Sequence, residues 1–171
     1  MSVSYDLLLA NCSLNEAIIR KVLKSLSIEV VGVRILNSGF YFYEFEPNIK
    51  LQINYSNRSD YPTGHPYSSF ETMFISDDFH CNYILSYDLE KNVEQDEAII
   101  QYKLLLSSVM ELTKISHREV LFTINSEDAF YYKNGIFFFE KNFYNFIEIN
   151  QHYKGILQKH ECEIFDGKYL R

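Results

Sequence analysis

The residue types that most often do chemistry gather at one place in this sequence, where Asp77 and Asp78 are followed by His80 and Cys81. Carboxylate, imidazole and thiolate groups at close spacing can bind a metal ion or activate a nucleophile. A loop that binds a hard cation needs several spaced oxygen donors and a Gly at its bend, and a zinc site needs paired Cys and His units. Neither pattern is present, so this segment is predicted to be a surface turn.

The remaining candidates for catalysis are a cysteine paired in space with a histidine and a mixed cluster near the C-terminus. Cys12 and Cys81 lack a flanking motif, and a free Cys is most often a small buried hydrophobic residue. In a strand, the run from His160 to Glu163 would place its His and Glu neighbours on opposite faces. The sequence contains no G-x-S-x-G, no H-E-x-x-H and no glycine-rich phosphate loop. We therefore expect no catalytic residue, no metal and no cofactor.

A long polar segment from Ser56 to Ser69 has turn-forming residues throughout and no hydrophobic period. Connections of this length are usually functional or disordered. His65, between a Gly and a Pro, is close to Tyr61 and Tyr67, and such side chains present rigid amphipathic surface to a partner. Two interpretations stay open: a recognition loop, or a connector stiffened by proline.

The elements that must position these residues are organised around the aromatic stretch from Glu119 to Phe146. Asn134-Gly135 predicts a tight hairpin turn, because a type I′ turn needs positive φ at both central positions and these residues tolerate it best. Lys133 then faces Ile136, and four rings lie on one face of the hairpin. These are the rings of Phe130, Tyr132, Phe137 and Phe139.

The strand before this hairpin tests its register. Val120, Phe122 and Ile124 alternate with other residues and are predicted to share the buried face with Phe130. That arrangement requires a five-residue connection, Asn125 to Ala129, or a bulge, because a shift of one residue would turn the strand over.

The rest of the chain is predicted to supply further strands and two principal helices. Strands are expected at Val3 to Leu9, Glu29 to Leu36, Phe40 to Glu46, Ile49 to Tyr55, Phe70 to Ile75 and Asn82 to Tyr87. The helices are expected at Leu14 to Leu26, after a capping box of Ser13 and Glu16, and at Asn92 to Thr113, with an acidic first turn. A short helix within Ile147 to Leu157 and a peripheral tail or short strand from His160 to Arg171 complete the chain.

These patterns predict an α+β fold in one domain, 1–171, in which both helices pack on one face of a mainly antiparallel sheet of about six to eight strands. The strand from Phe40 to Glu46 has apolar residues on both sides, which fits helices on one face and a loop or a partner on the other.

Composition limits the classes of partner. The net charge of −7 and the lack of a concentrated Lys and Arg footprint argue against binding to nucleic acid. Three unpaired cysteines indicate a reducing compartment, and no stretch is long enough to span a bilayer. We therefore expect a cytoplasmic protein without a membrane partner. Its acidity fits a basic protein partner as well as simple solubility.

Two stretches of the sequence resemble the immunity proteins of the bacterial swarming-inhibition (Sit) polymorphic toxin systems. The first is S-Y-D-L-L-L-A with the following L-x-E-A at Leu14 to Ala17, and the second is R-E-V-L-F-T-I-N-S-E at Arg118 to Glu127 with Y-Y-K-N-G-I-F-F-F-E-K-N at Tyr131 to Asn142. The sequence departs from the family at Ser126, where the family has Gly. The resemblance implies a cytoplasmic protein that binds and neutralises a cognate toxin without catalysis of its own.

On this interpretation the partner surface is expected to combine the polar loop with neighbouring acidic turns, because loops can vary while the sheet beneath them stays fixed. The residues predicted to contact the toxin are Asp60, Tyr61, His65, Tyr67, Asp77 and Asp78. Carboxylates would steer a basic toxin and the rings would supply buried anchors. The alternative is a cytoplasmic α+β domain that acts as a homo-oligomeric structural protein or binds a small ligand.

Overall fold

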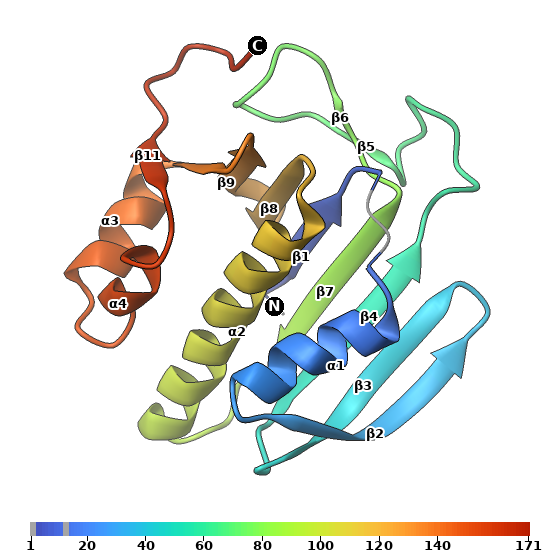
Figure 1. Ribbon diagram of the computed structural model, residues 1–171, viewed down its shortest axis with the longest axis vertical. Helices are drawn as coiled ribbons and strands as arrows, with labels where there is room; N and C mark the ends of the chain where they lie inside the picture. Colours follow the sequence, from blue (N-terminus) through green and yellow to red (C-terminus); the bar gives the residue numbers. More distant parts are fainter. Residues whose placement is uncertain (1–2, 12–13) are drawn as a thin grey trace.

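Alternating apolar and polar residues build one large sheet of nine strands within the part of the chain that the computed structural model describes, residues 3–11 and 14–171 (Figure 1). Its strands are β1 (Tyr5–Leu9), β2 (Glu29–Leu36), β3 (Gly39–Glu46), β4 (Leu51–Asn57), β7 (Tyr83–Leu89), β8 (Val120–Ile124), β9 (Glu127–Lys133), β10 (Ile136–Phe139) and β11 (Cys162–Ile164). They lie in the order β11-β10-β9-β8-β1-β7-β4-β3-β2. Every neighbouring pair is antiparallel except β10 and β11.

The α+β class and the mainly antiparallel sheet are therefore confirmed, whereas the expected single sheet of six to eight strands with two principal helices is matched only in part. The main sheet has nine strands, and a second sheet pairs β5 (Ser69–Phe70) with β6 (Phe79–His80). The strand predicted at Phe70 to Ile75 is reduced to this short pairing. The segment after it leaves the strand to cover the large sheet.

The aromatic hairpin has the predicted register. Lys133 pairs with Ile136, and the turn residues Asn134 and Gly135 have φ values of 52° and 90°. All four predicted rings belong to the main hydrophobic core, with Phe130 and Phe139 facing each other across the pair.

A bulge sets the register between β8 and β9. Phe122 pairs with Phe130, but the next pair is Thr123 with Asp128, so Ala129 is the additional residue. Of the two alternatives that the sequence left open, the structure contains the bulge, and Val120 and Phe122 of β8 reach the same core as Phe130.

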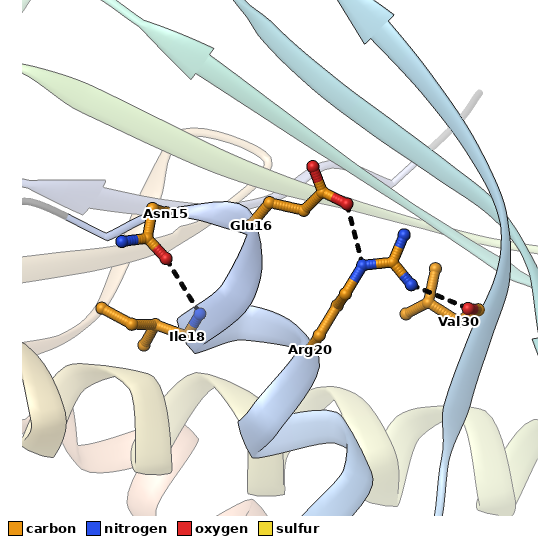
Figure 2. A network of polar contacts seen from close by, with 5 residues as sticks. All are labelled: Asn15, Glu16, Ile18, Arg20 and Val30. Carbon is orange, nitrogen blue, oxygen red and sulfur yellow. Dashed lines mark hydrogen bonds and ion pairs between the residues drawn. The ribbon is translucent and has the colours of Figure 1, made fainter.

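Helix α1 (Glu16–Ser25) begins later than predicted and has a different cap. Ser13 lies outside the described residues, and the cap is Asn15, whose Oδ1 accepts the Ile18 N–H at 3.0 Å (Figure 2). Arg20 then binds in two directions, to the Glu16 carboxylate at 2.8 Å and to the Val30 carbonyl at 2.8 Å. The first bond lies within α1, and the second bond joins α1 to the backbone of β2.

Helix α2 (Gln95–Ser116) crosses the same face of the sheet as α1 (Figure 1). It starts three residues after the predicted Asn92, and His117 ends it in the left-handed conformation. Two shorter helices follow the hairpin, α3 (Lys141–Ile149) and α4 (Lys154–Leu157). The short helix expected within Ile147 to Leu157 thus corresponds to the end of α3 and to α4.

The opposite face of the sheet has its own smaller core. The segment between β5 and β6 and the C-terminal tail pack against residues of β1, β7, β8 and β9. This core consists of Leu8, Phe74, Phe79, Cys81, Ile84, Leu121 and Tyr131, with Phe165 and Leu170 packed against it. The Leu170 N–H donates to the Phe74 carbonyl at 2.8 Å, which joins the tail to the β5–β6 connection. Of the two alternatives expected from His160 to Arg171, the short strand is confirmed as β11, and the residues after it pack against this smaller core. No helix in the described part of the chain is both long and apolar enough to cross a membrane.

Candidate partner-binding site

Three rings of the polar loop gather in one cluster, which we call the ring cluster: Tyr61, His65 and Tyr67. The ring centroids of Tyr61 and His65 are 4.6 Å apart, those of His65 and Tyr67 5.2 Å, and those of Tyr61 and Tyr67 5.6 Å. The Tyr67 N–H also donates to Nδ1 of His65 at 3.2 Å, which fixes the imidazole plane. These aromatic distances are typical of favourable ring contacts.

Arg58 completes the ring cluster from beneath. Its guanidinium carbon lies 5.9 Å from the Tyr61 ring centroid and 6.0 Å from that of Tyr67, within the range of a cation–π contact. Its buried Nε has no hydrogen-bond partner among the described residues. One cation therefore contacts both tyrosine rings, and one of its buried donors has no partner among the described residues.

Backbone hydrogen bonds hold the loop against the sheet. The Arg58 N–H donates to the Asn82 carbonyl at 2.6 Å, and the Asn82 N–H donates to the Leu9 carbonyl at 2.9 Å, so the loop begins on the end of β1. At its far end the Cys81 N–H donates to the carbonyl of the fully buried Ser68 at 2.8 Å. Both ends of the loop are fixed, so binding of a partner there loses little conformational entropy.

The ring cluster remains accessible although its backbone is fixed. Tyr67 is 58% exposed, Tyr61 and His65 are half-buried, and Asp60 is exposed beside them. An exposed tyrosine on a rigid loop is the kind of side chain that carries binding energy when a partner covers it.

A cavity of about 510 Å³ separates the loop from the open face of the sheet. Its lining includes Arg58 and Tyr67 from the loop, Asp6 of β1, Ser86 of β7 and Glu71 directly after β5. The Ser86 hydroxyl donates to Oδ1 of Asp6 at 2.5 Å, which holds the carboxylate in place. The cavity therefore combines an aromatic ring with two carboxylates and one guanidinium, so its lining has a single net negative charge.

Asp77 and Asp78 do not join this site. They are exposed residues of the connection between β5 and β6, which runs toward the C-terminal tail (Figure 1). Asp77 lines a different cavity, together with Lys133, Lys168 and Arg171. Of the six residues predicted to contact a partner, the structure places Asp60, Tyr61, His65 and Tyr67 on one loop and the other two on another.

Two parts of the site were missed from the sequence. Arg58 lies three residues before Tyr61, and this spacing does not predict that its guanidinium contacts the rings of Tyr61 and Tyr67. Asp6 lies in the first predicted strand, Val3 to Leu9, and its proximity to the loop depends on the pairing of β1 with β7. The alternating pattern of β1 was the one available signal for Asp6.

The segment from Asp77 to Cys81 does not form a metal site or an activated thiol in the described residues. No three His, Cys, Asp or Glu side chains there are grouped so as to hold a metal ion. Cys81 is fully buried, and burial raises the pKa of its thiol to about 12. His80 instead lies with its Nδ1 3.4 Å from the hydroxyl oxygen of Ser69.

Comparison of the chain with known proteins found no matching family model, no similar curated protein and no similar solved structure. The resemblance to the swarming-inhibition immunity proteins therefore rests on the sequence stretches quoted for it.

Proposed function

We propose that this protein is a cytoplasmic immunity protein without catalytic activity, which binds a cognate polymorphic toxin and neutralises it. The observation that carries the proposal is the ring cluster on a loop held to the sheet, with Arg58 against two of its rings and a cavity lined by Asp6 and Glu71 beside it. Such an arrangement offers anchors for a partner's surface and presents no group that is activated for chemistry.

The proposed partner is a basic protein surface. Asp60 lies beside the rings, and Asp6 and Glu71 line the adjoining cavity. With a net charge of −7 on the whole chain, these carboxylates would accelerate encounter with a cationic toxin, and Tyr61 and Tyr67 would be covered in the complex. Asp77 and Asp78 would then form a separate contact, if the toxin extends across the β5–β6 connection.

The experiment is a protection assay in which bacteria express the toxin encoded by the adjacent reading frame together with a variant of this protein. We expect Tyr61→Ala combined with Tyr67→Ala to abolish protection, because the anchors are removed while the sheet is left intact. The matched control is Tyr43→Ala, which removes a ring that is 46% exposed on β3 and lines a different cavity.

Circular dichroism of both variants serves as the check that each one is folded. Full protection by the double variant would contradict the proposed surface. If the adjacent frame encodes a metabolic enzyme instead of a toxin, the proposed function itself is wrong.

A further inference from the structure

A second cavity lies between the first turns of α2, the start of β1 and the end of β7. Phe146 of α3 and Tyr153, the residue before α4, also line it. Its volume is about 360 Å³, at the lower end of the range for small-molecule sites. Its lining includes Tyr5, Leu89, Ala98, Gln101, Tyr102 and Tyr153. The residues proposed to contact a toxin do not line it.

Aromatic rings form the walls of this cavity. The ring centroid of Tyr102 lies 5.8 Å from that of Tyr5, with an interplanar angle of 69°, and 5.2 Å from that of Tyr153. Phe146 adds a further ring 5.9 Å from Tyr102. Rings that meet edge to face leave flat apolar surfaces on which another ring can pack.

One polar side chain at the cavity has an unused hydrogen-bond donor. Gln101 is 2% exposed, and its Nε2 has no hydrogen-bond partner within the described residues. A buried amide without a partner is unfavourable, and buried polar groups are nearly always paired. An acceptor atom of a ligand would supply the missing partner.

The tyrosine hydroxyls add further donors. Burial, and to a smaller extent the neighbouring Tyr153, raises the pKa of Tyr5. Burial raises the pKa of Tyr102 even further, with contributions from Tyr5 and Tyr153. These phenols are therefore protonated at neutral pH and can donate to an oxygen.

Taking the walls and the donors together, we propose that this cavity binds a small neutral aromatic molecule that carries a carbonyl oxygen, with the Gln101 amide donating to that oxygen. The flat apolar walls favour the aromatic ring of the ligand, and the unpaired Gln101 amide favours its carbonyl oxygen. Glu90 and Lys91, which have opposite charges, both line the cavity, so its lining favours neither a cation nor an anion.

The test uses benzamide as the carbonyl probe and toluene as its apolar counterpart, each titrated into the full chain and followed by amide chemical shifts. We expect benzamide to shift resonances of 95–102 and of α3 and α4. In Gln101→Leu, which keeps the side-chain volume, we expect benzamide affinity to fall by about tenfold while toluene affinity is maintained or rises. The matched control is Ile100→Ala, which alters a residue that is 53% exposed and does not line the cavity.

Three results would overturn the proposal: no shifts with benzamide at its solubility limit, equal benzamide affinity in Gln101→Leu and the natural protein, or an equal loss in Ile100→Ala. None of these results depends on a toxin.

Discussion

At the scale of single residues, two turns of the same kind differ at one position. The turn between β9 and β10 has Asn134 and Gly135 at positive φ, and the turn between β8 and β9 has Asn125 and Ser126 at 52° and 66°. Gly adopts this conformation without steric cost, whereas the Cβ of Ser is crowded there. Ser126 therefore holds a conformation that a side chain disfavours.

We expect Ser126→Gly to raise the free energy of unfolding by about 0.5 to 1 kcal/mol, because relief of the crowding exceeds the greater chain entropy that Gly adds to the unfolded state. Gly135→Ser is the reciprocal variant and should lower it by a similar amount. Urea unfolding of both variants measures the two changes. Equal stability of both variants and the natural protein would show that these turns are not in the left-handed conformation.

The rings of the candidate site were predictable because they are close in sequence. Tyr61, His65 and Tyr67 fall within one short loop, so local chemistry indicated that they could act together. The position of Asp77 was not predictable in the same way. The connection that carries Asp77 leaves the loop at β5 and passes beside the C-terminal tail before it reaches β6. The packing of Phe74 and Phe165 against the far face of the sheet determines this path.

At the scale of the elements, local turn chemistry determined how well each strand pair could be predicted. Asn134-Gly135 specifies its hairpin through two adjacent residues, and the register of β9 with β10 followed from it. The parallel pairing of β10 with β11 joins Phe137 to Cys162, and no short turn specifies it. Helix α3 begins directly after the hairpin because the Glu140 carboxylate accepts the Phe143 N–H at 2.8 Å. The aromatic pattern of this stretch did not predict that cap.

Strands β3 and β4 meet closely at Gly39, which precedes the strand predicted from Phe40 to Glu46. A Cβ atom at Gly39 would lie 1.8 Å from the Tyr55 carbonyl oxygen in the neighbouring strand. We expect Gly39→Ala to lower the free energy of unfolding by about 3 kcal/mol, because the clash is with backbone and the strands must separate.

Gly155→Ala is the matched control, since nothing lies within 4 Å of a Cβ atom there and the residue is in α4. That variant should be unchanged or more stable by up to about 1 kcal/mol, from helix propensity. Thermal and urea unfolding compare the two variants, and an equally stable Gly39→Ala would contradict the close approach of β3 and β4.

At the scale of the whole molecule, a buried histidine connects the C-terminal segment to α2. The His160 side chain is 2% exposed, its ring centroid lies 5.2 Å from that of Phe137, and its Nε2 lies 3.7 Å from a carboxylate oxygen of Glu111. Burial lowers the pKa of His160 below its usual value, and this exceeds the opposing effect of Glu111.

This lowered pKa makes stability depend on pH in a defined direction. As the pH falls below about 6.5, His160 in the unfolded chain takes up a proton that the folded protein resists, so the free energy of unfolding falls until the folded pKa is passed. We expect a decline between about pH 7 and pH 5.5 that is smaller in His160→Gln. Urea unfolding across this range measures it, and identical pH dependence in both proteins would exclude His160 as the cause.

The whole molecule offers a loop that carries the ring cluster, held against a sheet whose two faces are partly covered by the chain's own helices, connection and tail. The most direct test of the proposed function is calorimetric titration of the toxin from the adjacent reading frame with three proteins: the natural chain, Tyr67→Ala and Tyr43→Ala. We predict that Tyr67→Ala weakens the complex by at least about tenfold, or about 1.4 kcal/mol, and that Tyr43→Ala changes the affinity by less than about twofold. Equal affinities for all three proteins, or a greater loss in Tyr43→Ala, would contradict the claim that the ring cluster anchors the toxin.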